Sequence, residues 1–323
     1  MRGALKKLLG KLRSRLWLHG LASPHDALIP EPVEGEAPAI CVGLIAGSGR
    51  LPLMLAEQLA LLDKPQEASS PPAVRFVIAA HREEADSTIA DYGAETLWVR
   101  LGQFKRIIRF FHEQGVTHVV MAGGINKVRI WSVRPDSLAL RIVAGLKHMH
   151  DDHLLRAISD AFEARGFMVA AAADFIPALL APLGQWGSHT PTEAQWTDIA
   201  FGWQMAKAVG DLDIGQGVVV HDRVVLAVEA VEGTDRLIKR VGKFARHGGI
   251  LVKVSKPDQD MRLDTPTVGV GTIRALHEAG LSGLAVEAGR THVIDLAEMV
   301  AEADKLGLFV VACNQKMLDA LES

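Results

Sequence analysis

The stretch ILVKVSKPDQDMRLDTPTVGV, residues 250–270, places a dense polar loop between two apolar runs. The runs at 250–252 and 267–270 predict short buried strands, so the polar side chains belong at strand ends on a scaffold. Ammonium and guanidinium groups suit phosphate oxygens, and carboxylates are hard oxygen donors for a divalent cation. The loop carries the cations Lys253, Lys256 and Arg262 and the carboxylates Asp258, Asp260 and Asp264. We expect metal-assisted chemistry at a phosphate, although a solvated turn with balanced charges explains the pattern equally well.

The composition is that of a globular chain with room for two domains. The chain has 323 residues, of which 49% are hydrophobic and 23% charged, and chains of this length usually divide into two cores. A formal charge of -3 and the lack of a basic stripe interleaved with aromatics argue against nucleic acid as a partner. Only two cysteines are present, which argues against a disulfide framework or a thiolate zinc site and favours a reducing, cytoplasmic compartment.

The first twenty residues differ from the rest because they hold six cations and no acid. The leucines at positions 5, 8, 9, 12 and 16 share one face of a helix, a pattern typical of helices that lie on an anionic membrane surface. A tail that packs nowhere is the alternative. Residues 22–38 hold four prolines and four acids without a period, which predicts a linker. No segment is long and apolar enough for a membrane span.

Residues 40–62 predict a strand, a glycine turn and a helix, the first elements of an α/β domain. The turn Gly47-Ser48-Gly49 would aim backbone N–H groups at an anion. It is a weak dinucleotide fingerprint, because Pro52 replaces the third small residue and the next strand, 74–80, ends in His81-Arg82 where an NAD site has an acid. We interpret the glycines as a tight turn that contacts a phosphate or sugar.

The remaining elements of this domain follow the same alternation. Strands are predicted at 96–100, 117–122 and 168–173, and the second of these ends in GGINK, where Asn126 is a candidate binder and Lys127 alone is explained by solvation. A cluster of three histidines at 148–153 surrounds Asp151-Asp152. Because His148 and His150 face different sides of a helix, we interpret the aspartates as a cap rather than as part of a metal site.

The second domain is predicted to begin near Thr192 with a helix that continues to Val209. Gln216 lies between two glycines just before a strand at 218–221, and a strand at 224–230 leads into Glu232-Gly233-Thr234-Asp235. A strand end followed by a glycine and a Thr-Asp pair is an anion-friendly helix start. A simple helix cap is the alternative, but Glu229, Glu232 and Asp235 supply more acids than one cap requires.

The ordered motifs also resemble one family. They are GLIAGSGRLP, AGGINK, DDHLLRAI, VGDLDIGQGVVV, LAVEAVEGTD, KVSKPDQDMRLDTPTVG, AGLSGLAVEAG and ADKLGLFVV. Over roughly residues 39–312 the chain resembles the LpxI-type UDP-2,3-diacylglucosamine pyrophosphatases of lipid A synthesis. The resemblance implies a hydrolase at the cytoplasmic face that uses Mg²⁺ to release 2,3-diacylglucosamine 1-phosphate and UMP. It also implies an essential aspartate in the motif R-x-D-x-P-T-x-G, here Asp264, and a lipid product held between two α/β domains.

We therefore predict two α/β domains joined by a short linker, with a Rossmann-like first domain and a ligand cleft between the two. The expected parts are a basic segment and linker at 1–38, domains at 39–174 and 190–323, and an interdomain linker at 175–189. Asp264 is the expected catalytic residue, and Asp264 and Asp260 are the expected ligands of Mg²⁺ or Mn²⁺. The expected substrate-binding residues are Gly47, Ser48, Gly49, Asn126, Thr192, Gln216, Thr234, Asp235, Lys253, Lys256 and Arg262.

The sequence leaves several questions open. Asp264 could hold the metal or accept a proton from the attacking water, and the uridine pocket, acyl-chain preference and oligomeric state have no visible signal. The expected partners are a lipid-linked UDP-sugar and the inner membrane surface. A non-catalytic sensor that binds a nucleotide sugar or lipid is the alternative function. An NAD-dependent oxidoreductase is disfavoured by Pro52 and by the missing acid at His81-Arg82.

Overall fold

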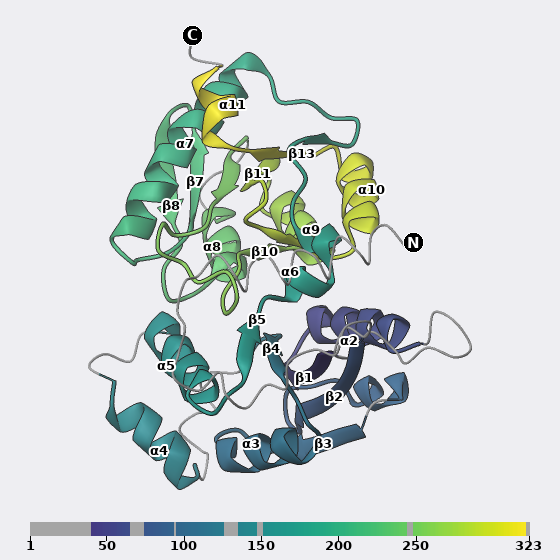
Figure 1. Ribbon diagram of the computed structural model, residues 1–323. Coiled ribbons are helices and arrows are strands. Elements are labelled where there is room, and N and C mark those ends of the chain that lie inside the picture. The colour runs from purple at the N-terminus through teal and green to yellow at the C-terminus, as the bar shows by residue number, and fades with distance from the viewer. Residues whose placement is uncertain are drawn as a thin grey trace. The chain divides into compact units, whose positions relative to one another are not determined.

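The structure is a computed structural model that describes residues 40–64, 74–93, 95–125, 135–146, 151–243 and 248–320. It divides into two compact units, Met1–Pro177 and Ala178–Ser323 (Figure 1). The predictions for residues 1–38, for Asn126 and Lys127 and for His148 and His150 lie outside the described residues. In the described part of the chain, no helix has both the length and the apolar character of a membrane span.

The first unit is built on a five-stranded sheet whose described pairs are all parallel, with the order β3-β2-β1-β4-β5. Because the chain runs outward from β1 in both directions, this is the doubly wound arrangement that the Rossmann-like prediction required. The strands are β1 (Ile40–Ala46), β2 (Val74–His81), β3 (Glu95–Val99), β4 (His118–Ala122) and β5 (Met168–Ala170). The helices are α2 (Arg50–Leu62), η2 (Ser87–Tyr92), α3 (Phe104–Glu113), α4 (Ser137–Ala144), α5 (Asp151–Glu163) and α6 (Ala172–Phe175), followed by η4 (Pro177–Leu179).

The second unit contains a six-stranded mixed sheet with the order β6-β13-β11-β9-β7-β8. Its strands are β6 (Gly184–Trp186), β7 (Gly217–His221), β8 (Val224–Val228), β9 (Ile250–Lys253), β11 (Gly283–Glu287) and β13 (Phe309–Cys313). A separate parallel pair joins β10 (Thr267–Val268) to β12 (His292–Val293). The helices are α7 (Glu193–Asp211), α8 (Thr234–Val241), α9 (Val270–Glu278), α10 (Leu296–Leu306) and α11 (Gln315–Asp319).

The stretch expected to be a linker, 175–189, contains one of these strands. β6 pairs antiparallel with β13, with Trp186 opposite Val310. The indole nitrogen of Trp186 donates to the carbonyl of Pro182 at 3.0 Å, and its ring is buried in the core of the second unit. This proline- and glycine-rich stretch therefore forms an edge strand of the sheet. The strand has only three residues, and it is held by its pairing with β13 and by the buried side chain of Trp186.

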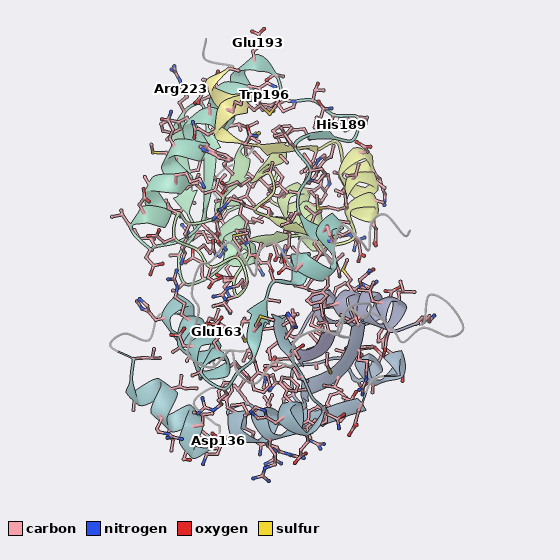
Figure 2. All side chains as sticks on the ribbon, in the orientation of Figure 1. Asp136, Glu163, His189, Glu193, Trp196 and Arg223 are labelled. Atoms are coloured by element: carbon pink, nitrogen blue, oxygen red, sulfur yellow. The ribbon has the colours of Figure 1, made fainter. Side chains whose placement is uncertain are left out.

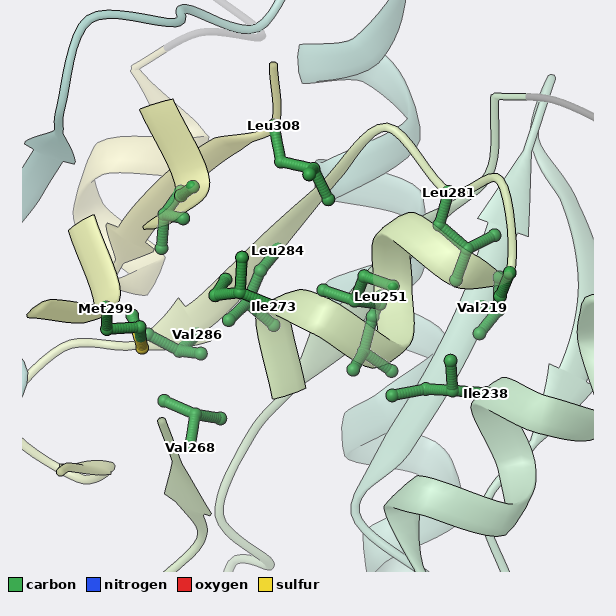
Figure 3. Close-up of a cluster of buried hydrophobic side chains, with 14 of the residues drawn as sticks. Val219, Ile238, Leu251, Val268, Ile273, Leu281, Leu284, Val286, Met299 and Leu308 are labelled. Atoms are coloured by element: carbon green, nitrogen blue, oxygen red, sulfur yellow. The ribbon is translucent and has the colours of Figure 1, made fainter. Parts of the chain in front are cut away.

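Both faces of the second sheet are covered by helices, so its central strands are apolar on both sides. Along β9, Leu251 packs into the cluster with α8, α9 and α10, shown in Figure 3, while Ile250 and Val252 pack on the opposite face with α7. This period of two places the next residue, Lys253, on the face that carries α8. The alternation therefore decides where the first cation of the polar loop points.

Candidate functional site at the carboxyl edge of the second sheet

The polar groups of the second unit gather at one edge of its sheet. Strands β8, β9, β11 and β13 run in the same direction, and β7 runs opposite to β8 and β9. The carboxyl ends of four strands therefore meet the start of β7, as the pairing of Lys253 with Gly217 and with Val286 shows. The polar residues at this edge are Gln216, Glu229, Lys253 and Glu287. This arrangement confirms that the central loop begins at a strand end.

Lys253 is the centre of the site. Its ammonium donates to the hydroxyl of Thr234 at 2.7 Å and to the carbonyl of Thr267 at 3.4 Å. The hydroxyl of Thr234, the first residue of α8, donates a hydrogen bond to Glu229, with 2.7 Å between Oγ1 and Oε1. A continuous hydrogen-bonded chain thus links Lys253, Thr234 and Glu229, and it includes the hydroxyl of Thr234, one of the expected substrate-binding residues.

Three carboxylates share the field of this lysine. Burial lowers the pKa of Lys253, whereas the charges of Glu229, Asp264 and Asp235 act to raise it. Lys253 and Glu229 are only 5% exposed, so little solvent screens them. Oxygen Oε2 of Glu229 is buried and has no hydrogen-bond partner among the described residues. The ammonium of Lys253 thus interacts with three carboxylates.

Asp264 is positioned by Gln259, a buried residue that the sequence analysis did not select. The amide nitrogen of Gln259 donates to Oδ2 of Asp264 at 2.9 Å and to the side-chain oxygen of Gln216 at 3.2 Å. The amide oxygen of Gln259 accepts the backbone N–H of Lys256 at 2.9 Å. Gln259 therefore ties the loop to the turn before β7 and orients the carboxylate of Asp264. Only its position between Asp258 and Asp260 could have suggested a role.

Two other cations of the loop, Arg262 and Lys256, form ion pairs with aspartates of the second unit. Arg262 binds Asp260 through two nitrogens, with 3.0 Å between Nε and Oδ1 and 2.7 Å between Nη2 and Oδ2. Lys256 contacts Asp213 at 2.6 Å. The structure thus brings Asp264, Lys253, Thr234, Asp235 and Gln216 together, while Asp260 and Arg262 neutralise one another and Lys256 turns toward Asp213.

A second polar cluster at the same edge was not found from the sequence. Glu287, at the end of β11, accepts both the N–H and the hydroxyl of Ser255, at 2.8 and 2.7 Å. Lys207 of α7 donates to both oxygens of Glu287, at 2.9 and 2.7 Å. Arg290 donates from Nε to the hydroxyl of Ser255 at 2.5 Å. In the sequence, this cluster is signalled only by Glu287, a charged residue at the end of an apolar strand.

Thr192 has a structural role. It is the N-cap of α7, where its hydroxyl accepts the N–H of Gln195 at 3.3 Å and the side chain of Gln195 accepts the N–H of Thr192 at 2.9 Å. Figure 2 shows Glu193 and Trp196 in the turn that follows. This reciprocal pair is a capping box, which satisfies two N–H groups at the start of the helix.

The glycine turn of the first unit is fastened to the end of β4. The backbone of Ser48 exchanges two hydrogen bonds with Gly124, at 2.8 and 3.0 Å, and its hydroxyl donates to the carbonyl of Gly124 at 2.9 Å. Gly47 donates to Ala122 at 2.8 Å, and a Cβ on Gly47 would overlap the carbonyl oxygen of Gly124. Gly49 has a φ of 98°, which glycine adopts without strain. Close backbone approach therefore explains Gly47, and the positive φ explains Gly49.

The acidic groups that could hold a divalent cation differ in their surroundings. Asp198, His221 and Asp222 lie close together, but Asp198 accepts the backbone N–H groups of Asp222 and Arg223 and so fastens the β7–β8 turn. At the carboxyl edge, the carboxylates of Glu229, Asp235 and Asp264 all act on Lys253, but their oxygens do not form a group as close as that of Asp198, His221 and Asp222, whose ligand atoms lie within 4.8 Å of one another. Carboxylate and amide oxygens are the donor types that suit Mg²⁺ or Mn²⁺.

Comparisons with known proteins cover nearly the whole described chain. The model of the LpxI N-terminal domain matches residues 41–179, and that of the LpxI C-terminal domain matches residues 182–311. A UDP-2,3-diacylglucosamine pyrophosphatase LpxI of Caulobacter vibrioides is 36% identical over 285 residues, which cover 84% of this chain and 97% of that protein. Among solved structures, an L-threonine dehydrogenase from Phytophthora infestans covers 87% of each chain at 10% identity, but its TM-score of 0.28 is too low to support an argument.

Proposed function

The chain belongs to the LpxI family, and we propose that it hydrolyses the pyrophosphate bond of UDP-2,3-diacylglucosamine in lipid A biosynthesis. The products would be 2,3-diacylglucosamine 1-phosphate and UMP. The Caulobacter relative carries the name of this activity and aligns over almost its full length. The observation that supports the same chemistry here is the group of three carboxylates around the buried ammonium of Lys253, with Asp264 held by Gln259.

This group has the equipment that pyrophosphate hydrolysis needs. The reaction depends on charge neutralisation at the phosphates and on alignment of the attacking water more than on covalent chemistry. Asp264 would be a ligand of Mg²⁺ or Mn²⁺, which when bound supplies positive charge at the phosphate oxygens. Gln259 fixes one oxygen of Asp264 and thereby aims the other. The ammonium of Lys253 reduces the electrostatic repulsion among the three carboxylates.

The assignment is tested by comparing two aspartates of the same loop. Asp264→Asn should lower UMP release by about 10²–10⁴-fold, the range for loss of a general base or a charge at the reacting centre, while circular dichroism stays unchanged. Asp260→Asn is the matched control, because Asp260 is already paired with Arg262, and it should retain activity within about tenfold. Near-normal turnover by Asp264→Asn would exclude the proposed role of this residue.

Metal dependence is tested separately with the purified full chain. UMP release should stop in excess EDTA and return when Mg²⁺ or Mn²⁺ is restored. Full activity in EDTA would rule out the metal. Binding of the lipid-linked UDP-sugar without any release of UMP would instead favour a non-catalytic sensor.

We also propose that the protein is cytoplasmic and contacts the inner face of the inner membrane through residues 1–38. The six cations of this segment would each add about 1 kcal/mol near an anionic leaflet, and less at high salt. The full chain should sediment with anionic liposomes in low salt, whereas a chain beginning at Ala39 should bind them much less and still hydrolyse detergent-dispersed substrate. Equal liposome binding by both chains would show that the segment is only a tail.

A further inference from the structure

Arg290 is the most exposed member of the Ser255 cluster, ahead of Lys207, whose side chain is 27% exposed. Ser255 is fully buried and Glu287 is 8% exposed, whereas the side chain of Arg290 is 40% exposed. Its Nε donates to the hydroxyl of Ser255 at 2.5 Å and lies 3.8 Å from a carboxylate oxygen of Glu287. The guanidinium group is therefore held at the carboxyl edge of the sheet by its inner nitrogen.

The outer edge of this guanidinium group is open. Within the residues that the structure describes, neither terminal nitrogen of Arg290 donates a hydrogen bond to the protein. A guanidinium carries its N–H groups in a fixed planar fork, so anchoring at Nε determines the direction in which the terminal nitrogens point. Two parallel N–H groups match the spacing of two phosphate oxygens. Arg290 thus has the geometry of a preoriented anion-binding residue.

The buried part of the cluster serves to hold this residue rather than to balance charge. Glu287 is the single carboxylate between two cations, Lys207 and Arg290, so the group has one excess positive charge. Buried ion pairs of this type are often replaceable by apolar side chains without loss of stability. The burial of Glu287 between Lys207 and Arg290 therefore indicates that this carboxylate has a role other than packing.

The cluster lies beside the carboxylate group of the site. Ser255 is two residues from Lys253, and Glu287 follows Val286, the strand partner of Lys253. The carboxyl edge is consequently divided into an acidic half around Lys253 and a basic half around Ser255. A diphosphate whose metal is held by the acidic half would present its remaining oxygens to the basic half.

We propose that Arg290 binds a phosphate group of the substrate, and that Ser255 and Glu287 position its guanidinium group for this contact. This inference rests on the proposed pyrophosphatase function for the identity of the substrate, but it predicts phosphate binding on its own. Lys207 supports the arrangement by holding Glu287 from the opposite side.

The test uses the full chain with Arg290→Ala, Arg290→Lys and the control Arg274→Ala, whose arginine is exposed and paired with Glu302 at 2.8 Å. Arg290→Ala should lower kcat/KM by about 10–100-fold, the effect of losing a charged phosphate contact. Arg290→Lys should fall in between, because an ammonium cannot bond Ser255 and present a fork as well. Added guanidinium ion should recover part of the activity of Arg290→Ala and leave Arg274→Ala unchanged.

A second measurement separates this proposal from the pyrophosphatase function. Calorimetry with inorganic pyrophosphate and Mg²⁺ should show at least tenfold weaker binding by Arg290→Ala than by Arg274→Ala. If the unaltered protein releases no UMP but this difference persists, the pyrophosphatase function fails and the phosphate site stands. If Arg290→Ala matches Arg274→Ala in both turnover and pyrophosphate binding, the proposal is wrong. Should the alanine variant fail to fold, the same comparisons apply to Arg290→Lys.

Discussion

Replacement of Glu229 by glutamine tests the chain of hydrogen bonds at the centre of the site. The substitution keeps the shape of the side chain and removes its charge. Thr234 can still donate to the amide oxygen, so the 2.7 Å contact is retained. What changes is the electrostatic environment of the buried Lys253. Of the three carboxylates whose charges raise the pKa of this lysine, the substitution removes the one with the largest effect.

The magnitude follows from the burial of this pair. Removing one partner of a buried ion pair costs about 3–5 kcal/mol when the other charge is left uncompensated. Asp264 and Asp235 remain near Lys253, so we expect a smaller loss of about 1 kcal/mol in the free energy of unfolding at pH 7, the difference between charged and neutral hydrogen bonds.

The pH dependence has a definite sign. Burial holds the pKa of Lys253 below its usual range in the folded protein, and the loss of Glu229 lowers it further. The loss of stability caused by Glu229→Gln has its full size at pH values where Lys253 is protonated in both the unaltered protein and the variant. It disappears at pH values where Lys253 is neutral in both. The stability difference between the two proteins should therefore shrink as the pH rises toward 10.

Urea unfolding from pH 7 to 10, followed by the fluorescence of the buried Trp186 and Trp203, measures this difference. Glu302→Gln is the control, because Glu302 forms a surface pair with Arg274, and it should change stability less than Glu229→Gln does. If Glu229→Gln unfolds at the same urea concentration as the unaltered protein at every pH, the chain from Lys253 to Glu229 has no electrostatic importance and the argument fails.

Two further predictions concern buried groups. Burial lowers the pKa of His81, and likewise of His118 and His292, to about 4. The unfolded chain therefore binds more protons between pH 6.5 and 4, and the free energy of unfolding should decrease by about 3 kcal/mol per histidine as the pH falls through this window. The free energy of unfolding of His81→Gln should decrease less over the same window, and an unchanged pH dependence would contradict this prediction. Gly217→Ala would place a Cβ 2.7 Å from Oε2 of Glu229, so UMP release should drop by roughly tenfold or more. Gly271→Ala is the control and should remain active, because a Cβ at this position meets no atom within 4 Å. Equal activities of the two variants would show that the side chain of Glu229 can move without consequence.

Local periodicity explains how much of the fold could be predicted. The strand, turn and helix predicted over residues 40–62 correspond to β1 and α2, and the strand predicted at 218–221 corresponds to β7, because each has one dominant hydrophobic period between turn residues. β6 was missed because three residues are too few to show a period, and its formation depends on β13, more than a hundred residues away. Strand order in the mixed sheet likewise depends on pairings that no local pattern specifies.

The same limit applies to the site. The sequence identified the loop after β9 and the acids around Thr234, since both follow strand ends. It did not show that Thr234 bonds Lys253, which is 19 residues away, or that Lys207 reaches Glu287 across 80 residues. Each of these contacts crosses from a helix to a strand end, so the residues become neighbours only when the sheet assembles.

The division of charge at the carboxyl edge explains why two aspartates of one loop differ. A guanidinium group binds both oxygens of Asp260, which neutralises that carboxylate in place. Gln259 donates to Asp264 without neutralising it, and Lys253 is shared with Glu229 and Asp235. A divalent cation would therefore be attracted more to the three carboxylates near Lys253 than to Asp260, whose charge a guanidinium group already compensates. Two aspartates of the same loop thus have different electrostatic surroundings, and the difference arises from the residues that each side chain contacts in the folded protein.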